Sequence, residues 1–323
     1  MSRVAVVGSG PAGCAAAIAL CRAGAHVVLL GDGADAVGEQ LHPAARPLLE
    51  RLGIHQLTDQ LACVGVRAAW RSGELHDQDF LGHPFGNGWL LDRTSFGALL
   101  RGRAAQAGAV LRMPTRLLGV ARDATHGWQL RLSDGELRCD WIVDASGRRG
   151  AVARLLGVKR RRFDTQMALV GWLATERDDD TDATLTVETS EGGWWYSCRL
   201  PGQRRVAGWI GTSRPDARRW EDALRQTRHL RHRVAGYRVI GPPVVRAADS
   251  SLLARCWGPR WIAIGDAAAS YDPLASRGMV GALASGLEAA SLVGASEPAL
   301  ARWQTALEER FARYLEQRAP FYA

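Results

Sequence analysis

The sequence lacks the features of a membrane or secreted protein. Arginine, glycine or aspartate interrupts every apolar run, so none reaches the roughly 18 residues that a membrane-spanning helix requires. Only residues 1–3 precede the first predicted strand, which leaves no room for the charged and apolar segments of a signal peptide. We therefore expect a cytoplasmic protein that does not enter the membrane.

Cysteine is sparse, and its spacing argues against two common kinds of site. No two cysteines form a C-x-x-C pair, so neither a zinc motif nor a disulfide framework is indicated. Buried free thiols in a reducing compartment explain the pattern better. We predict no metal site and no disulfide. The cysteines are Cys14, Cys21, Cys63, Cys139, Cys198 and Cys256.

Lysine is almost absent, because Lys159 is its only occurrence, and arginine carries nearly all of the positive charge. The formal net charge is +8, and cations concentrate at residues 159–163 and 225–233. Such clusters favour an acidic peptide, phosphate or nucleic-acid partner, or they are solvated helix faces. No signature of a nucleic-acid-binding fold accompanies them. The sequence leaves an acidic macromolecular partner open and predicts no specific nucleic-acid partner.

The chain is long enough for two lobes or one large domain, and it begins with a β-α-β pattern. Its 323 residues, of which 47% are hydrophobic, can bury a large core. The apolar runs at residues 3–7 and 26–30 predict short buried strands. The small residues at 11–23 predict a helix that ends at Gly24.

A glycine motif joins the first of these strands to the helix. The spacing of Gly8, Gly10 and Gly13 is typical of dinucleotide binding when a strand precedes it and a helix follows. The first glycine permits the tight turn, the second lets a pyrophosphate approach the backbone, and the third lets helix and strand pack closely. The unpaired amides at the helix start would face the phosphate, and Pro11 and Ala12 are the candidate cofactor-binding positions there.

The second strand of such a unit usually ends with an acidic residue that binds the ribose hydroxyls. Here Gly31 occupies the usual position and Asp32 follows it. We therefore take Asp32 as the candidate ribose ligand.

The rest of the chain alternates between helical and extended patterns. Residues 90–111 predict a helix that Gly108 closes. The tryptophan-rich segment 163–211 predicts a second sheet, with an acidic loop at 176–182 that we expect at a hairpin tip. The remaining predictions are strands at residues 116–122, 128–132, 136–143 and 260–268, an extended segment at 239–251, and helices at 215–234 and 278–318.

These elements predict a discontinuous nucleotide-binding domain with a sheet inserted into it. The nucleotide-binding domain comprises residues 1–75, 90–160 and 250–323. Residues 76–89 and 161–249 form the expected substrate domain.

Three separated segments resemble the flavin motifs of one superfamily. They are "GSGPAG" (8–13), "DASGRRG" (144–150) and "IGDAAASYDPLASRGM" (264–279). Together they resemble the FAD-dependent aromatic hydroxylases, halogenases and geranylgeranyl reductases. The resemblance covers essentially the whole chain and implies FAD as the cofactor. It implies an α/β fold: an FAD-binding Rossmann-like domain (glutathione reductase type 2, p-hydroxybenzoate hydroxylase-like) with an inserted β-sheet substrate domain.

The resemblance also assigns cofactor contacts to individual residues. It implies that Asp266, after Gly265, binds the flavin ribityl chain and that Arg93 reaches the FAD phosphates. Asp144 and Gly147 belong to the stretch that touches FAD and, in hydroxylases, NADPH. Asp266 can also merely cap a helix, and Arg93 can be an exposed charge. The amides implied to lie against the isoalloxazine are those of Arg277, Gly278 and Met279.

Local details resemble the tryptophan-halogenase-like monooxygenases, which include maturases that hydroxylate a tryptophan within a protein. The similar segments are residues 38–54, 68–75, 86–93 and 192–202. Flavin halogenases carry a lysine before the arginine helix and a W-x-W-x-I-P motif. Residues 38–95 contain no lysine, and Trp194-Trp195-Tyr196 does not fit that motif, so halogenation is disfavoured. These three aromatic residues line the substrate face or are core residues.

The expected reaction needs few side chains. The resemblance implies that reduced FAD reacts with oxygen to give a flavin C4a-hydroperoxide, while the protein orients the substrate and excludes water. Glu39 and His42 are candidates for proton handling or substrate anchoring, or they are a helix cap and a rim residue. Asp272, in the turn beside the isoalloxazine, is a third catalytic candidate, unless it only shapes the turn.

Three functions remain open. The first is an FAD monooxygenase that hydroxylates an aromatic, indole or tryptophan substrate, free or carried on a peptide or protein. It would use O2 and NADPH, NADH or a separate flavin reductase. The second is a flavin-dependent reductase or dehydrogenase of the geranylgeranyl reductase type. The third is a non-catalytic protein of the same fold that docks a macromolecule.

The resemblance also bears on the lid of the active site. Proteins of the family are expected to continue beyond residue 323 into a further helix, so the sequence does not define the active-site lid.

Overall fold

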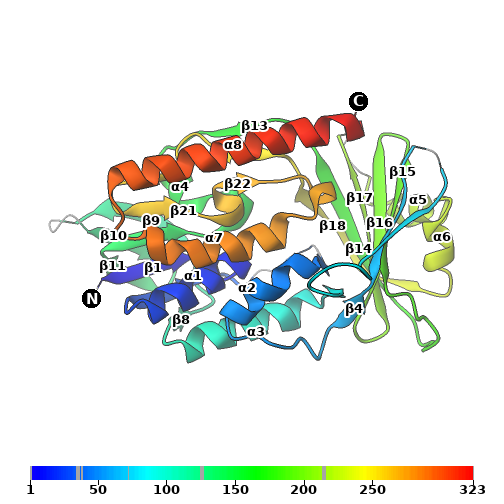
Figure 1. Ribbon diagram of the computed structural model, residues 1–323, viewed down its shortest axis with the longest axis horizontal. Coiled ribbons are helices and arrows are strands. Elements are labelled where there is room, and N and C mark those ends of the chain that lie inside the picture. Colours follow the sequence, from blue (N-terminus) through cyan, green and yellow to red (C-terminus); the bar gives the residue numbers. More distant parts are fainter. Residues whose placement is uncertain are drawn as a thin grey trace.

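The computed structural model describes residues 2–33, 37, 39–71, 73–123, 127–212 and 216–322. Two layered units lie side by side (Figure 1). One is a mainly parallel sheet with helices against it, and the other is a large, mainly antiparallel sheet at the opposite end of the molecule. This arrangement confirms the predicted α/β fold with an inserted sheet.

The first unit is built on a six-stranded sheet in the order β20-β21-β12-β1-β2-β8. All neighbours run parallel except β20 and β21. Parallel strands that are covered on both faces are continuous apolar runs, and β1 is buried at every position after its first. The strands are β1 (Arg3–Val7), β2 (His26–Leu30), β8 (Val110–Arg112), β12 (Trp141–Asp144), β20 (Trp257–Gly258) and β21 (Trp261–Ala263).

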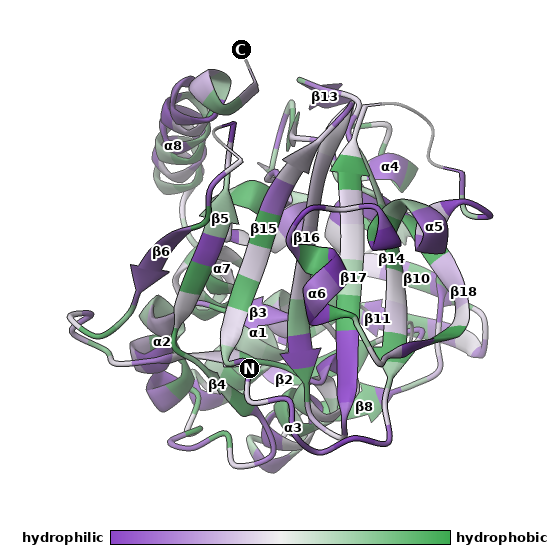
Figure 2. Cartoon of the chain, turned by 90° about the vertical axis from the view of Figure 1, so that its right-hand side faces the viewer, coloured by the Kyte–Doolittle hydropathy of each residue, from purple (hydrophilic) through white to green (hydrophobic). Residues whose placement is uncertain are grey.

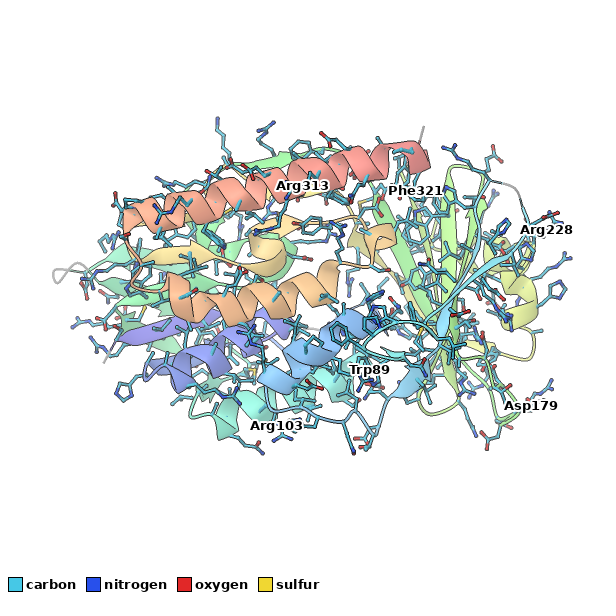
Figure 3. The ribbon with its side chains drawn as sticks, viewed as in Figure 1. Trp89, Arg103, Asp179, Arg228, Arg313 and Phe321 are labelled. Atoms are coloured by element: carbon cyan, nitrogen blue, oxygen red, sulfur yellow. The ribbon has the colours of Figure 1, made fainter. Side chains whose placement is uncertain are left out.

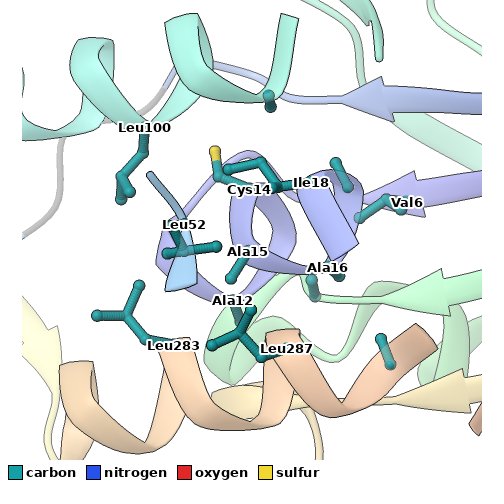
Figure 4. Close-up of a cluster of buried hydrophobic side chains, with 14 of the residues drawn as sticks. Val6, Ala12, Cys14, Ala15, Ala16, Ile18, Leu52, Leu100, Leu283 and Leu287 are labelled. Atoms are coloured by element: carbon teal, nitrogen blue, oxygen red, sulfur yellow. The ribbon is translucent and has the colours of Figure 1, made fainter. Parts of the chain in front are cut away.

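Helix α1 (Pro11–Arg22) packs between α3 (Arg93–Gln106) and α7 (Gly278–Leu292) (Figure 4). Small residues let α1 and α7 approach closely, since a Cβ on Gly286 would lie 2.5 Å from the Ala12 carbonyl oxygen. The other helices of this unit are α2 (Arg46–Arg51), α4 (Ala151–Leu155) and α8 (Glu297–Tyr322). The side chains that fill the helix interface include Cys14, Ile18, Leu52, Leu100, Leu283 and Leu287.

The second unit is a seven-stranded sheet in the order β18-β14-β17-β16-β15-β5-β6. Neighbours are antiparallel except β15 and β5. One face, here called the inner face, packs toward the first unit. Two short helices, α5 (Trp220–Arg225) and α6 (Leu230–Arg233), cover the outer face (Figure 2). The strands are β5 (Gly65–Ala69), β6 (His76–Asp79), β14 (Met167–Ala174), β15 (Thr184–Ser190), β16 (Gly193–Leu200), β17 (Arg204–Gly211) and β18 (Arg238–Ala247).

Small sheets and short 3-10 turns complete the described part of the chain. The sheets have the orders β11-β10-β9, β13-β19-β22 and β3-β7-β4. Their strands are β3 (Gln40–Leu41), β4 (Leu61–Cys63), β7 (Gly88–Leu90), β9 (Leu117–Arg122), β10 (Trp128–Leu132), β11 (Gly135–Cys139), β13 (Arg160–Arg162), β19 (Ser251–Leu253) and β22 (Ala269–Ser270). The turns are η1 (Pro43–Ala45), η2 (Gly147–Arg149), η3 (Gly265–Ala267) and η4 (Pro273–Ala275).

Several predicted boundaries are wrong. Residues 65–69, assigned to the nucleotide-binding domain, form β5 of the seven-stranded sheet, where the partner is β15. A local pattern cannot reveal a partner so distant in sequence. The predicted strand 136–143 is two strands, β11 and β12, in different sheets. The predicted helix 278–318 is two helices, because Gly294 has a φ of +85° after α7. The predicted helix 215–234 is α5 and α6, and residues 213–215 lie outside the described residues.

The acidic loop at 176–182 is not a hairpin tip. It joins β14 to β15, which β17 and β16 separate in the sheet. Asp180 and Asp182 instead pair with Arg205 at 2.8 and 3.0 Å. The Arg205 side chain is fully buried, so the loop supplies the counter-charge for a buried cation.

All six cysteines are free, and all but Cys21 are buried. Burial raises the pKa of Cys14 to about 12, so this thiol is uncharged and acts as an apolar side chain. Within the described ranges, no cluster of three or more His, Cys, Asp and Glu residues is arranged to hold a metal ion. The helices in these ranges also fall short of the length and apolarity that crossing a membrane demands.

Candidate active site

The glycine turn between β1 and α1 has the shape that its sequence predicts. Gly8 has a φ of +115°, and a Cβ there would lie 2.2 Å from the Ala145 carbonyl oxygen. A Cβ on Gly13 would lie 1.7 Å from the Gly8 carbonyl oxygen. These two glycines therefore have the predicted turn and packing roles. No described atom lies within 4 Å of the Cβ position of Gly10, so the start of α1, at Pro11, leaves room for a phosphate.

Asp32 follows the end of β2 and forms an ion pair with Arg149 at 2.6 Å. The position before it has no room for a side chain, because a Cβ on Gly31 would lie 2.1 Å from the Ser9 Oγ atom. This explains why the acidic residue comes one position later than usual. The Asp32 side chain is 26% exposed, so it lies at the rim of the glycine turn. Its binding to a ribose stays a prediction.

The second and third flavin-like motifs meet the glycine turn. Gly265 in η3 has a φ of +55°, and a Cβ there would lie 2.8 Å from the Ala12 Cβ. Arg148 in η2 donates to the Tyr271 carbonyl oxygen at 2.7 Å and lies 3.7 Å from the Asp266 carboxylate. Three distant segments thus converge at the carboxyl ends of β1, β12 and β21, where open α/β sheets bind ligands.

Asp266 and Arg93 form the charged centre of this region. Burial raises the pKa of Asp266, and neighbouring arginines, Arg148 foremost, oppose this shift. Arg93, at the start of α3, donates to the Val37 carbonyl oxygen at 2.9 Å. Burial lowers the pKa of Arg93, while the charges of Glu39 and Asp266 oppose this shift. The charge of Arg93 therefore acts on two carboxylates, and the residue is partly buried rather than an exposed surface charge.

Asp144, predicted in the stretch that touches the cofactor, uses its carboxylate within the chain. Its carboxylate is fully buried and accepts hydrogen bonds from the amides of Ser146, Val152 and Ala153 at 3.1, 2.9 and 3.0 Å. Burial raises the pKa of Asp144, and these hydrogen bonds oppose the shift. Asp144 therefore holds the start of α4. Gly147, with a φ of +67° and no described atom within 4 Å of its Cβ position, remains a candidate for a cofactor contact.

The turn before α7 presents backbone to its surroundings. Arg277 is the N-cap residue, and Gly278 is the first residue of the helix. Among the described residues, no atom lies within 4 Å of the Gly278 Cβ position. Met279 packs partly against the core. Because a helix start carries partial positive charge, these amides suit a ring that gains negative charge, and their contact with the isoalloxazine stays a prediction.

Asp272, predicted as a catalytic residue, uses both carboxylate oxygens within the chain. Oδ1 accepts a hydrogen bond from the Leu274 amide at 2.8 Å, and Oδ2 accepts one from the Arg318 Nε at 2.8 Å. The residue is 2% exposed. The catalytic assignment is therefore corrected, because the carboxylate shapes the turn, as the alternative interpretation held.

The three aromatic residues predicted at the substrate divide between the two faces of the sheet. Trp194 and Tyr196 lie on the inner face of β16. Trp195 lies on the outer face and packs against Trp220 with ring centroids 6.1 Å apart. Side chains alternate along a strand, so Trp195 cannot line the substrate face, and its assignment is wrong. The Tyr196 ring covers Gly208, where a Cβ would lie 2.2 Å from it.

Glu39 connects the sheet to the flavin-like motifs. The residue is 3% exposed, and the Tyr196 hydroxyl donates to its Oε2 over 3.5 Å. Burial raises the pKa of Tyr196 well above its usual range, and the Glu39 charge adds to this shift. The charges of Glu39 and Asp266 both act on Arg93, so Glu39 is coupled electrostatically to the flavin-like motifs. The alternative that Glu39 caps a helix is wrong.

His42 caps the η1 turn. Its Nδ1 accepts a hydrogen bond from the Ala44 amide at 3.2 Å, which places the proton of the neutral ring on Nε2. Burial lowers the pKa of His42, and the neighbouring His83 adds to the shift. The ring contacts Phe80 and His83 edge-on, each with centroids 5.2 Å apart. Any proton transfer by His42 would therefore use Nε2.

Sequence reasoning missed the residues that contact Trp194 and Asp272, two of which, Arg318 and Tyr322, lie on α8 near the end of the chain. Trp194 Nε1 donates to the Tyr322 hydroxyl at 3.0 Å, and Trp70 lies 6.1 Å from Trp194 between ring centroids. Arg318 binds Asp272, as described above. No local motif marks these residues, because their contacts arise only when α8 packs beside the sheet.

The arginine-rich segment 225–233 lies away from the site, whereas Arg160 of the other segment contacts η3 beside Asp266. Residues 225–233 lie on α5 and α6, on the outer side of the sheet, as Arg228 shows in Figure 3. Arg225 pairs with Glu221 at 2.7 Å. In the other segment, Arg160 donates to the Ala267 carbonyl oxygen. An acidic partner for the outer surface stays a prediction.

Residues 1–291 match the family model described as FAD binding domain. The chain is 28% identical over 334 residues to the putative FAD-dependent oxidoreductase LodB of Marinomonas mediterranea, covering 96% of this chain and 89% of that protein. It is 31% identical over 338 residues to the menaquinone reductase of Mycobacterium tuberculosis, covering 96% of this chain and 80% of that protein.

Solved structures share the fold. The peptidyl tryptophan dihydroxylase QhpG, essential for tryptophylquinone cofactor biogenesis, matches with a TM-score of 0.80 at 25% identity, over 99% of this chain and 75% of that chain. The flavin-dependent halogenase CmlS matches with a TM-score of 0.86 at 22% identity, over 99% of this chain. This chain spans 64% of the length of that halogenase, and the likeness shows the fold alone.

Proposed function

Because the chain belongs to the FAD binding domain family, we propose that this FAD-dependent oxidoreductase is a monooxygenase that hydroxylates an aromatic, indole-type substrate. The substrate is free or carried on a peptide or protein. The observation that carries the proposal is the aromatic inner face of β16, where Trp194 and Tyr196 lie and Tyr196 meets Glu39. The likeness to the peptidyl tryptophan dihydroxylase over nearly the whole chain supports the substrate class.

The residues present fit FAD. The space beside Gly10 and Gly278, clear of described atoms within 4 Å, leaves room for a ligand against two helix starts. The start of α1 would hold the pyrophosphate, Asp32 a ribose, Arg93 the phosphates and Asp266 the ribityl chain. The start of α7 would lie against the isoalloxazine.

When bound, FAD carries two electrons from NADPH, NADH or a separate reductase to dioxygen, so that one oxygen atom enters the substrate and the other leaves as water. The chain's own residues orient the substrate and exclude water. Trp194 and Tyr196 offer edge and face contacts to an aromatic ring. The buried cluster that joins Trp194 to Cys198 and Leu274 keeps water from this face.

Glu39 is the group best placed to anchor a polar atom of the substrate. Its carboxylate accepts a hydrogen bond from the Tyr196 hydroxyl and interacts with the Arg93 charge, which compensates its own charge. A carboxylate in this setting accepts a hydrogen bond from an indole N–H. Because an indole ring is itself nucleophilic, Glu39 is needed to orient the ring rather than to act as a strong base.

The test is oxygen incorporation by the FAD-loaded protein. N-acetyl-L-tryptophanamide and a tryptophan-containing peptide serve as probes, with NADPH as the electron donor. We expect oxygen uptake that depends on the probe and, under oxygen-18 gas, a product that carries one labelled oxygen atom. Oxygen uptake that ends only in hydrogen peroxide with every aromatic probe contradicts the proposal.

A second candidate function is a flavin-dependent reductase. Identity to the menaquinone reductase is 31%, which exceeds the 25% identity to the dihydroxylase. A reductase turns over without oxygen, whereas a monooxygenase does not. Reduction of menaquinone by the FAD-loaded protein under anaerobic conditions would therefore favour this candidate over the first.

A further inference from the structure

The C-terminal end of α8 reaches the seven-stranded sheet, where Phe321 lies (Figures 1 and 3). Trp70 packs edge-on against Phe321 and Tyr322, with ring centroids 5.9 and 6.3 Å apart. The Tyr322 hydroxyl accepts a hydrogen bond from Trp194 at 3.0 Å. The helix end thus contacts the tryptophan that the proposed function places at the substrate face.

Arg318, about one turn earlier, binds the turn that precedes α7. Its Nε lies 2.8 Å from the Asp272 Oδ2 and its Nη2 lies 3.2 Å from the Asp164 carboxylate. Its guanidinium lies 4.2 Å from the Tyr322 ring centroid. The side chains of Arg318 and Asp272 are 15% and 1% exposed. One cation therefore neutralises two nearly buried carboxylates, and no surface pairing can replace it.

The same carboxylate sets the backbone of the turn. The Asp272 Oδ1 accepts from the Leu274 amide at 2.8 Å. In the amide orientation that satisfies both of its groups, Gln166 donates to the Asp272 Oδ2 at 3.1 Å and accepts from the Tyr322 hydroxyl at 3.0 Å. A continuous set of contacts thus leads from Trp194 through Tyr322, Gln166 and Asp272 to the turn at 272–277.

We propose that Arg318 is a positioning residue for the flavin. By holding Asp272 it fixes the turn at 272–277, which precedes the helix start that faces the isoalloxazine. By stacking on Tyr322 it ties this turn to the inner face of the sheet. The inference rests on the proposed function for the place of the substrate, and on FAD binding alone for its effect on the flavin. The C-terminal end of α8 therefore lines the active site.

The test compares two arginines of the same helix. Arg318→Gln removes the buried cation, and Arg318→Lys keeps a positive charge but lacks the planar guanidinium group. Arg313→Gln is the matched control at an exposed position (Figure 3). The measurements are the dissociation constant of FAD and the visible circular dichroism of bound FAD. We expect Arg318→Gln to weaken FAD binding by about tenfold and to change the visible spectrum. Arg318→Lys should lie between this variant and the wild type, and Arg313→Gln should match the wild type.

Equal FAD affinity and equal visible spectra in Arg318→Gln and Arg313→Gln overturn the proposal. A loss of thermal stability with an unchanged spectrum of bound FAD also overturns it, because it shows a merely structural role. If Arg318→Gln does not fold, Asp272→Asn tests the same contact, since it keeps an acceptor for the Leu274 amide and loses the charge that binds Arg318. Wild-type affinity and spectrum in that variant count against the proposal equally. None of these measurements needs a substrate, so a failed hydroxylation assay leaves them interpretable.

Discussion

The two faces of the seven-stranded sheet bury different chemistry. On the outer face, Trp195 packs against Trp220, and the fully buried Arg205 lies against Asp180 and Asp182 at 2.8 and 3.0 Å. Among the described residues, the ion-pair partners of this cation belong to the same unit. The charged groups of the outer face therefore pair within their own unit, and this face contributes to stability.

The inner face of the same strands directs its polar groups away from the sheet. The Tyr196 hydroxyl donates to Glu39, and the charges of Glu39 and Asp266, the latter in the flavin-like motifs, both act on Arg93. Because side chains alternate along β16, one strand contributes to the core on one side and to a site on the other. Substitutions on the two faces should therefore be separable, since both sets can change the free energy of unfolding but only those on the inner face should also change ligand binding.

Replacing Arg205 by methionine should give the largest effect. The change removes the buried cation that pairs with Asp180 and Asp182 and leaves Asp182 with the more distant Arg233, at 3.9 Å, which costs about 3–5 kcal/mol in the free energy of unfolding. FAD affinity of the folded fraction should stay at the wild-type value. Urea denaturation, followed by far-ultraviolet circular dichroism, measures the first quantity, and fluorescence titration measures the second.

Adding Asp180→Asn and Asp182→Asn to Arg205→Met should recover most of the loss, because no buried charge then remains in the cluster. If Arg205→Met alone unfolds like the wild type, Arg205 is not the counter-charge of these two carboxylates.

The loss of stability in acid provides an independent check. Burial opposes ionisation of Asp180, but hydrogen bonds from Arg205 and Tyr237 lower its pKa to about 2. The resulting stability is complete above the unfolded pKa, near ~4, and is lost as the pH falls toward 2. Arg205→Met should lack much of this acid dependence.

Adjacent tryptophans test the two faces most directly. Trp195→Ala and Trp194→Ala each remove a buried indole and should each destabilise by about 3–5 kcal/mol. Only Trp194→Ala should lower kcat/KM for an aromatic probe, by about tenfold or more, because only its side chain lies on the inner face. Chemical denaturation and steady-state kinetics on the folded protein give both numbers. Equal kinetic losses in the two variants would contradict the division of the sheet.

These tryptophans also show what the sequence can and cannot predict. The glycine turn has the local backbone shape that its motif predicts, and the charges of Arg93 and Asp266 lie in one region, while their contacts with FAD stay predictions. Trp195 was misassigned although strand alternation alone separates it from Trp194. The motifs located Asp144 and Asp272 but could not show that their carboxylates bind neighbouring amides. The contact of Tyr196 with Glu39 joins residues far apart in sequence, so only the fold reveals it.

Glu39→Gln should give an intermediate effect confined to the inner face. It keeps the shape of the side chain and removes the charge that faces Arg93. We expect kcat/KM to fall by about 10–100-fold, with stability changed far less than in Arg205→Met. Tyr196→Phe removes only the hydroxyl and should cost less. Steady-state kinetics with the same aromatic probe measures both variants, and an unchanged kcat/KM in Glu39→Gln would remove Glu39 from the site.

Tyr322→Phe should give the smallest effect, and it tests the role of a single hydroxyl group. It removes one hydroxyl, the acceptor for Trp194 at 3.0 Å, and keeps the ring that packs on Arg318 and Trp70. One net hydrogen bond is worth about 1 kcal/mol, so KM for the aromatic probe should rise about fivefold while kcat and FAD affinity stay constant. Phe321→Leu is the control, because it changes a ring in the same cluster without touching Trp194. If both variants change KM alike, the hydroxyl does not orient Trp194, and the helix end acts on the inner face only by covering it.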